Sequence, residues 1–219
     1  NGGSAADFKH QIGYFSRDYK VILADSRAQG KSVEGSDSLS YEMMADDYNL
    51  LLDKLGIDSC YVVGWSDGGI NGLLLAQRHP EKVRKLAITG ANLWPDTTAL
   101  EPFLVKSIKY EIDSLNHVPQ TTEVKAQKKL LKLMAFNPHI PVEDLKKVNC
   151  PTLVIGGDQD VIFPSHTMVI AEAIPKSYLW ILPDAGHSTL VVYKDLFNQI
   201  VGDFFKKPYK KKTGVAQFE

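Results

Sequence analysis

The sequence contains no apolar run that approaches the roughly 20 residues needed to cross a bilayer, and no excess of one charge. Its 25 lysine and arginine residues nearly balance its 26 aspartate and glutamate residues, which gives a formal net charge of -1. This balance argues against nucleic acid as a partner and against attraction to an anionic membrane. A lysine cluster within residues 206–212 is the local exception. We interpret it as a solvated tail, with an interaction patch as the alternative.

Cysteine is scarce as well: Cys60 and Cys150 each stand just before an apolar segment. Two cysteines do not support a disulfide framework, so we expect buried free thiols. The six histidines show no metal-ligand spacing. The sequence also has no glycine fingerprint for a dinucleotide and no P-loop lysine. We therefore predict neither a metal nor a cofactor, and a small-molecule substrate as the partner.

The chain lacks an initiator methionine, since it starts with Asn1-Gly2-Gly3-Ser4, and it shows no signal peptide. A mature or trimmed start therefore stays open as an interpretation. The sequence assigns no compartment and no oligomeric state, although the cytoplasm is favoured because a signal peptide is not visible.

The chain does have a regular alternation of short apolar segments with amphipathic ones, within 219 residues of ordinary composition. Continuous apolar strands that alternate with helices predict an α/β fold, with a mostly parallel sheet covered by helices on both faces. We expect strands at residues 20–25, 60–64, 83–89, 152–156 and 178–182. We expect helices at residues 5–19, 40–55, 69–78, 165–173 and 190–206. Ser40 is the expected N-cap of the second helix, and Gly56 its end.

The alternation breaks between residues 93 and 148. Amphipathic helical segments occur there around residues 100–115 and 122–135, without a convincing strand. We interpret this stretch as an inserted helical lid. The predicted organisation is thus a core made of residues 1–92 and 149–219, with residues 93–148 as the cap.

Residues 64–68 read Gly-Trp-Ser-Asp-Gly, the pattern Gly-x-Ser-x-Gly, directly between an expected strand and an expected helix. A serine on a strained strand-to-helix turn needs neighbours small enough for the backbones to pass closely, which explains the glycines. Such a turn projects the hydroxyl above the sheet, beside helix N–H groups that favour developing negative charge. We therefore predict that Ser66 is a catalytic nucleophile, with a purely structural turn as the alternative.

Asp160 and His187 follow the fourth and fifth expected strands. Both therefore lie at the carboxyl edge of the sheet, where parallel sheets place their chemistry. We predict that His187 is the general base that takes the proton of Ser66, and that Asp160 orients and stabilises its imidazolium. Asp158 is the rival acid, although a role in capping its own turn suits it better.

Four segments together resemble the α/β-hydrolase family, and the resemblance covers nearly the whole chain outside the lid. They are residues 19–32, 64–69, 150–160 and 186–187. The first is similar to the family's Val-Ile-x-x-Asp-x-Arg-Gly-x-Gly-x-Ser segment, with Ala28 where the family usually has glycine. Within the family, residues 64–69 and the following Gly90-Ala91-Asn92 look most like the valacyclovir-hydrolase-like group, which cleaves α-amino-acid esters. The resemblance implies the α/β-hydrolase fold and a serine hydrolase.

The resemblance also leads to the hypothesis that N-terminal strands are missing from this sequence. The family opens with three more strands, and the third lies between those expected at residues 20–25 and 60–64. Without it, buried backbone groups would stay unpaired, which is costly. Direct pairing of those two strands would refute the hypothesis. The family builds its oxyanion hole from the N–H after the nucleophile, here Asp67, and an N–H of an early loop that Asn1 matches.

If its carboxylate reaches the pocket, Asp67 favours a cationic group near the scissile bond, such as a free α-amine. The alternative is that Asp67 only caps backbone donors at the start of the helix. Trp65, Trp94, Phe103 and Phe136 are candidates for an apolar acyl pocket, with core packing as the alternative.

We predict that the protein hydrolyses a small carboxylic ester through an acyl-enzyme, an α-amino-acid ester among the candidates. The same three residues also support amide, lactone or carbon–carbon bond hydrolysis, because a fold does not determine a reaction. From another class, the alternative is a ligand-binding receptor on a hydrolase scaffold with little turnover.

Overall fold

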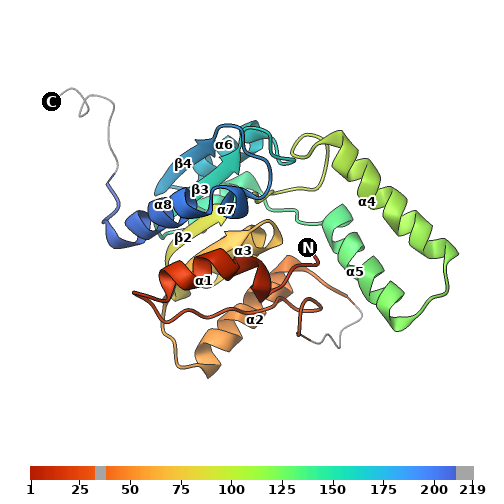
Figure 1. The fold of residues 1–219 in the computed structure, drawn as a ribbon, viewed down its shortest axis with the longest axis horizontal. Coiled ribbons are helices and arrows are strands. Elements are labelled where there is room, and N and C mark those ends of the chain that lie inside the picture. Colours follow the sequence, from red (N-terminus) through yellow and green to blue (C-terminus); the bar gives the residue numbers. More distant parts are fainter. Residues whose placement is uncertain (33–37, 211–219) are drawn as a thin grey trace.

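The computed structural model describes residues 1–32 and 38–210, so the end of the predicted lysine tail lies outside the described residues. Within these ranges the sheet has four strands, all parallel (Figure 1). They are β1 (Cys60–Trp65), β2 (Val83–Thr89), β3 (Thr152–Gly157) and β4 (Ser177–Leu182), in the order β1-β2-β3-β4. All of β3 is buried, as expected for a continuous apolar strand inside a parallel sheet. Four of the five predicted strands are therefore confirmed.

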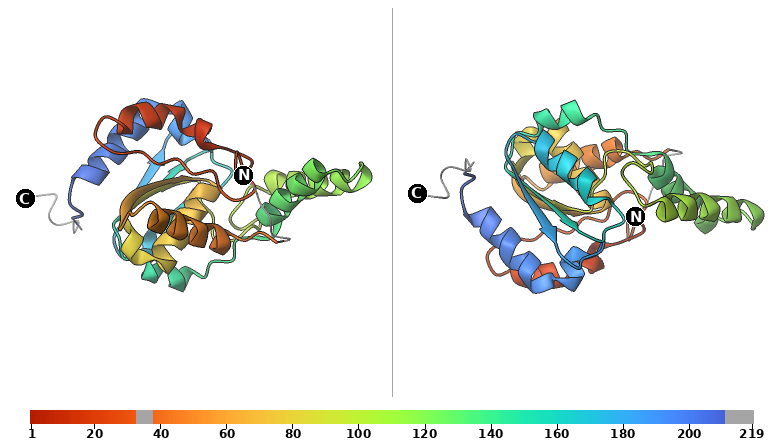
Figure 2. Two further views of the ribbon diagram at one scale, coloured as in Figure 1. Left: turned by 90° about the horizontal axis from the view of Figure 1, so that it is seen from below. Right: turned by 90° about the horizontal axis from the view of Figure 1, so that it is seen from above.

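Helices cover both faces of this sheet, as the fold class requires (Figure 2). The helices on one face are α2 (Tyr41–Lys54), α3 (Asp67–Arg78) and α6 (Pro164–Ala173). Those on the other face are α1 (Lys9–Phe15), α7 (Thr189–Val192) and α8 (Lys194–Lys206). The short 3-10 helices are η1 (Ala5–Phe8), η2 (Pro80–Lys82), η3 (Leu115–His117) and η4 (Val142–Lys147). No helix among the described residues is both long and apolar enough to cross a membrane.

Local sequence signals set the bounds of α2. Ser40 is its N-cap, with an extended backbone and a side chain that accepts the N–H of Met43 at 3.2 Å. Gly56 follows the helix with a φ of +66°, the left-handed conformation in which glycine commonly ends helices. The C-terminal helix is less regular than predicted, because the backbone leaves the helical conformation at Tyr193 and separates α7 from α8.

The strand predicted at residues 20–25 is wrong for this structure. These residues belong to no ladder, and Val21, Ile22 and Leu23 are 36–41% exposed. A cavity of about 1230 Å³ is lined both by this segment and by β1, so the two do not pair directly. An apolar segment forms a strand only when a partner lies within ladder distance, about 4.8 Å. The hypothesis of N-terminal strands between them stays a hypothesis.

The segment interpreted as a lid contains two long helices, α4 (Pro102–Ser114) and α5 (Thr122–Phe136). They form a hairpin that projects away from the sheet and its covering helices (Figures 1 and 2). Within residues 93–148 the described structure has one isolated bridge, from Leu100 to Ile162, and no strand. The helices are therefore as predicted, and the division into core and cap stays a prediction.

Both cysteines are free thiols, as predicted. Cys150 is buried, whereas Cys60 is only half-buried, at the start of β1. Burial raises the pKa of both thiols, so neither is activated as a thiolate.

Candidate active site

Ser66 lies on the sharp turn between β1 and α3. Its φ of 56° and ψ of -121° are unusual for a residue with a side chain, which is the strain expected of a nucleophile turn. A Cβ at Gly64 would lie 2.2 Å from the carbonyl oxygen of Gly68, so the turn requires glycine at position 64. The backbone N–H of Ser66 donates to the carbonyl of Thr89 at 2.9 Å, which ties the turn to the neighbouring strand.

The structure brings Ser66, His187 and Asp160 together from three separate loops. His187 Nε2 lies 2.9 Å from Ser66 Oγ, and His187 Nδ1 lies 2.7 Å from Asp160 Oδ1. Asp160 is only 4% exposed, and its Oδ1 also accepts the backbone N–H of Ile162 at 3.0 Å. These contacts form one continuous hydrogen-bonded path from hydroxyl to carboxylate. Such a path lets the imidazole take a proton while a buried negative charge stabilises the resulting cation.

Asp158, the rival acid, has a different partner. Its Oδ1 accepts the backbone N–H of Ala185 at 3.1 Å, within the loop that leads to His187. This contact joins two loops that are 27 residues apart in the sequence, so it differs from the cap of its own turn that the sequence favoured for Asp158. Among the described residues, no group of three or more histidine, cysteine, aspartate or glutamate side chains is arranged to hold a metal ion.

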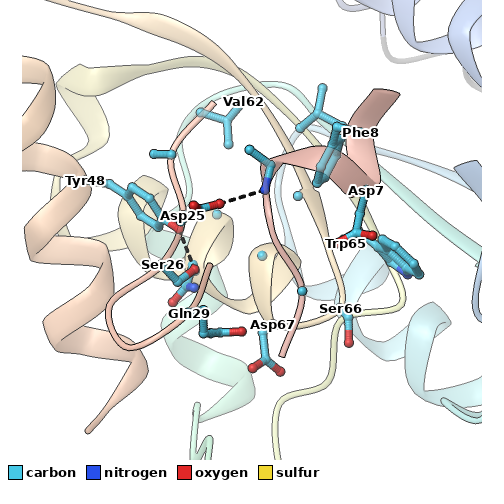
Figure 3. A pocket seen from close by; sticks show the side chains of 18 of the residues that line it. Asp7, Phe8, Asp25, Ser26, Gln29, Tyr48, Val62, Trp65, Ser66 and Asp67 are labelled. Carbon is cyan, nitrogen blue, oxygen red and sulfur yellow. Dashed lines mark hydrogen bonds between the residues drawn. The ribbon is translucent and has the colours of Figure 1, made fainter. Parts of the chain in front are cut away.

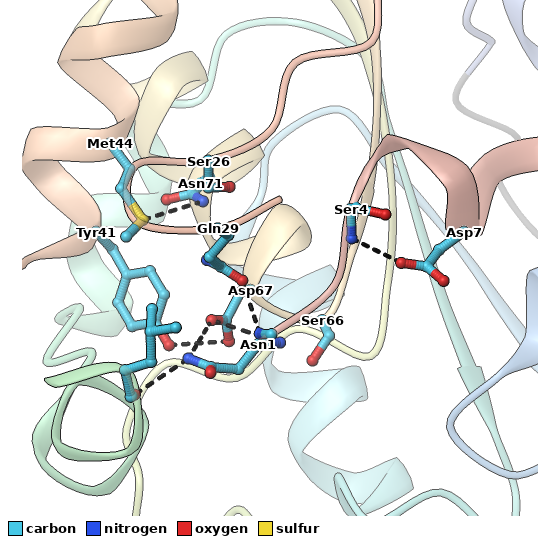
Figure 4. Close-up of polar contacts among 12 residues, drawn as sticks. Asn1, Ser4, Asp7, Ser26, Gln29, Tyr41, Met44, Ser66, Asp67 and Asn71 are labelled. Atoms are coloured by element: carbon cyan, nitrogen blue, oxygen red, sulfur yellow. Dashed lines mark hydrogen bonds and ion pairs between the residues drawn. The ribbon is translucent and has the colours of Figure 1, made fainter. Parts of the chain in front are cut away.

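Asp67 follows Ser66 and is only 6% exposed, and its carboxylate accepts hydrogen bonds from side chains (Figure 4). Tyr41 Oη donates to Asp67 Oδ1 at 2.9 Å, and Asn1 Nδ2 donates to Asp67 Oδ2 at 3.0 Å. The amino group of Asn1 lies 3.7 Å from the same Oδ2. Burial, followed by the negative charge of Asp67, raises the pKa of Tyr41 well above its usual value, so this phenol stays a donor.

Sequence reasoning missed Tyr41 and Gln29 near this carboxylate. Tyr41 is the first residue of α2, and nothing local to its sequence distinguishes it from a core aromatic. Gln29 is 7% exposed and accepts the backbone N–H of Gly2 at 2.7 Å through Oε1. Its position beside Gly30, which has a φ of +55°, was the available signal, because tight turns often present functional side chains.

The large cavity described above includes this site (Figure 3). Ser66 and Trp65 lie on one side of it, and Asp25 and Tyr48 on the other. The cavity is also lined by Asn1, Asp67 and His187, and by Leu104, Leu130 and Met134 of α4 and α5.

Of the four aromatic side chains predicted for an acyl pocket, only Trp65 is among the cavity-lining residues. Trp94 instead packs edge-on against His166, with ring centroids 4.5 Å apart, and donates its indole N–H to Thr98 at 2.8 Å. Phe103 and Phe136 are 80% and 58% exposed on the projecting hairpin. The sequence did not reveal these orientations, because they depend on neighbours that are remote in the sequence, such as His166 for Trp94.

Comparisons with known proteins place the chain among hydrolases. The family described as alpha/beta hydrolase fold matches residues 1–114. The protein named "Putative carbamate hydrolase RutD" from Caulobacter sp. (strain K31) is 28% identical, over 93% of this chain and 87% of that protein. The serine hydrolase BPHL of Homo sapiens is 25% identical, over 94% of this chain and 76% of that protein. Among solved structures, a thermophilic esterase from Thermogutta terrifontis aligns with a TM-score of 0.77 and 21% identity, covering 94% of this chain and 87% of that one.

Proposed function

The chain belongs to the alpha/beta hydrolase fold family, and we propose that it is a serine hydrolase that cleaves a small carboxylic ester through an acyl-enzyme. The observation that carries the proposal is the hydrogen-bonded path from Ser66 through His187 to Asp160, with distances of 2.9 and 2.7 Å. A buried carboxylate, an imidazole and a strained serine in this order form the arrangement by which unrelated folds activate a hydroxyl.

In the proposed reaction, Ser66 Oγ attacks the ester carbonyl carbon while its proton moves to His187 Nε2. The tetrahedral intermediate collapses as His187 returns this proton to the leaving alcohol. A water molecule then gives a proton to His187 and attacks the acyl carbon. This second tetrahedral intermediate collapses as His187 returns the proton to Ser66 Oγ, which releases the carboxylic acid and restores the free enzyme. The proton on Nδ1 stays on the ring throughout, and Asp160 accepts its hydrogen bond and stabilises the imidazolium.

The negative charge on the carbonyl oxygen needs donors that are already in place. We assign this role to the backbone N–H of Asp67, the first residue of α3, where the helix dipole is positive. Asn1 is the second proposed donor. Its contacts with Asp67 and with the carbonyl of Leu130 at 3.1 Å support a location beside this helix end.

For the substrate, we propose an ester with a free α-amine. Asp67 supplies a buried carboxylate directly after the nucleophile, and it lines the same cavity as Ser66. The attraction between a substrate cation and such a carboxylate is stronger in a site of low dielectric than in water. Trp65 is the proposed apolar contact for the acyl group, because it lies in the cavity wall next to Ser66.

Four variants test these assignments on a panel of p-nitrophenyl and amino-acid esters. Ser66→Ala and Asp160→Asn should lower kcat by about 10³-fold or more, whereas Asp158→Asn, the matched control, should keep most of the activity. Equal losses in Asp158→Asn and Asp160→Asn would overturn the assignment of the acid. Asp67→Asn should lower kcat/KM for free amino esters by at least about 10-fold relative to their N-acetylated forms. An unchanged ratio would remove Asp67 as the amine anchor.

A second candidate reaction is hydrolysis of a carbamate or amide. The relative RutD carries carbamate hydrolase in its name, and its similarity extends over 93% of this chain. The same nucleophile attacks either carbonyl, and the substrates differ in the leaving group that His187 protonates. A carbamate turned over faster than its matched ester would favour this candidate. Thermal stabilisation by esters without any Ser66-dependent turnover would instead indicate a ligand-binding receptor.

A further inference from the structure

His187 has to keep a precise distance from Ser66, yet it lies in the loop that joins β4 to α7. Loops are more mobile than the elements they connect. A misplacement of about 1 Å between reacting groups costs about 10²-fold in rate. The contact with Asp160 orients the imidazole ring, but a single hydrogen bond at the tip of a side chain does not fix the backbone that carries it.

The first contact that fixes this backbone comes from Trp65. Its indole Nε1–H donates to the carbonyl oxygen of His187 at 2.8 Å. The Trp65 and His187 ring centroids lie 6.1 Å apart, at an interplanar angle of 46°. Trp65 is covalently bonded to Ser66, so one hydrogen bond links the backbone of the base to the residue beside the nucleophile.

The second contact joins two buried hydroxyls. Thr89 Oγ1 and Thr189 Oγ1 lie 2.7 Å apart, and neither threonine has any exposed surface. Thr89 ends β2 and accepts the backbone N–H of Ser66, whereas Thr189 begins α7, two residues after His187. Thr89 therefore contacts the nucleophile turn through its backbone and the histidine loop through its side chain.

The space beneath the imidazole is equally restricted. Gly90, directly after Thr89, has a φ of +64°. A Cβ at this position would lie 2.7 Å from His187 Cε1 and 2.9 Å from His187 Nδ1. The imidazole therefore has no room to move toward Gly90, while the hydrogen bonds of Trp65 and Thr89 restrain the loop that carries it.

We propose that Trp65 and Thr89 are positioning residues that hold His187 in register with Ser66. The inference rests on the proposed serine-hydrolase function and assigns Trp65 a role beyond contact with an acyl group. The two residues come from the ends of neighbouring parallel strands, which are rigid and paired residue by residue, Trp65 with Thr89. The separation of base and nucleophile is therefore set by the sheet rather than by the loop.

The kinetic test uses Trp65→Phe, which removes the indole donor, and the double variant Thr89→Val/Thr189→Val, which removes both hydroxyls without leaving one unpaired. We expect kcat to fall on the order of 10-fold in each, with KM within about two-fold of the starting protein. The single variant Thr89→Ser keeps the hydroxyl, so its kcat should stay close to that of the starting protein. Trp180→Phe in β4 is the matched control for loss of an indole and should behave like the starting protein.

A rise in KM at unchanged kcat in Trp65→Phe would overturn its positioning role in favour of substrate contact alone. A crystal structure of Trp65→Phe supplies the readout that needs no turnover. The His187 Nε2 to Ser66 Oγ distance should exceed the present 2.9 Å, and an unchanged distance would overturn the inference. If the starting protein shows no Ser66-dependent turnover, the proposed function fails, and this distance still decides the inference about position. Should the threonine double variant fail to fold, Trp65→Phe decides it alone.

Discussion

The hydrogen bond from Tyr41 to Asp67 should be worth markedly more than a similar bond between neutral groups nearby. Tyr41 is 1% exposed and donates at 2.9 Å to a carboxylate that is itself 6% exposed. Hydrogen bonds to charged groups contribute about 1.5–3 kcal/mol, and those between neutral groups about 0.5–1.5 kcal/mol. Tyr41→Phe deletes only the hydroxyl, so a buried carboxylate oxygen loses a donor while the aromatic packing stays.

Tyr48→Phe is the matched control. Tyr48 is on the same helix, and its hydroxyl contacts Ser26 Oγ at 2.7 Å, a neutral partner. Loss of about 2 kcal/mol in Tyr41→Phe corresponds to a fall in Tm of about 4–8 °C for a chain of this size. Loss of about 1 kcal/mol in Tyr48→Phe corresponds to about half of that fall.

The assay is urea unfolding of both variants followed by circular dichroism, at pH 7 and at pH 9. Burial and the charge of Asp67 raise the pKa of Tyr41, so the phenol keeps its proton at both pH values. The difference between the variants should therefore be the same at each pH. Equal losses in Tyr41→Phe and Tyr48→Phe would refute the reasoning, because they would mean that the bond to Asp67 carries no charge assistance.

Two further predictions concern the scaffold. Ala28 has a φ of 62°, a conformation that favours glycine, so Ala28→Gly should stabilise the protein by about 1 kcal/mol, measured as a rise in Tm. A lower Tm would contradict strain at this turn. Burial lowers the pKa of His166 to about 4, so the unfolded chain binds a proton that the folded chain does not, and stability is lost as the pH falls from about 6.5 to about 4. His166→Gln, which keeps an acceptor for the N–H of Leu93, should reduce this loss by on the order of 2 kcal/mol between pH 7 and pH 4.5 in urea unfolding, and an unchanged loss would exclude His166 as its source.

The sequence predicted those parts of the fold whose determinants are local. Ser40 and Gly56 bound α2 through a cap and a left-handed glycine, and both signals depend only on neighbouring residues. Ser66, Asp160 and His187 were predicted because each follows an apolar strand, and parallel strands bring their carboxyl ends to one edge. Their contacts in the structure match that expectation.

The failures share a different cause, since each depends on a partner that is remote in the sequence. The segment at residues 20–25 has the composition of a strand but faces a cavity, and no local pattern reports whether a neighbouring strand is present. Trp94 was a candidate for the acyl pocket with core packing as the alternative, and its ring meets His166 of α6, the choice that the sequence left open. The break at Tyr193 accompanies a hydrogen bond from its hydroxyl to the carbonyl of Pro183, ten residues earlier.

The sequence left two roles open for Asp67, an anchor for a substrate cation or a cap for backbone donors, and the two roles predict different substrate selectivity. The structure gives its carboxylate side-chain partners, Tyr41 and Asn1, so a buried carboxylate belongs to the same residue whose backbone N–H we propose for the oxyanion hole. Like charges in a site of low dielectric repel each other, so whatever negative charge of Asp67 its partners leave uncompensated would raise the barrier for a neutral ester. A substrate ammonium group would offset this repulsion as the oxyanion develops. Selectivity for amino esters should therefore be visible in kcat as well as in KM, because the compensation is greatest in the transition state.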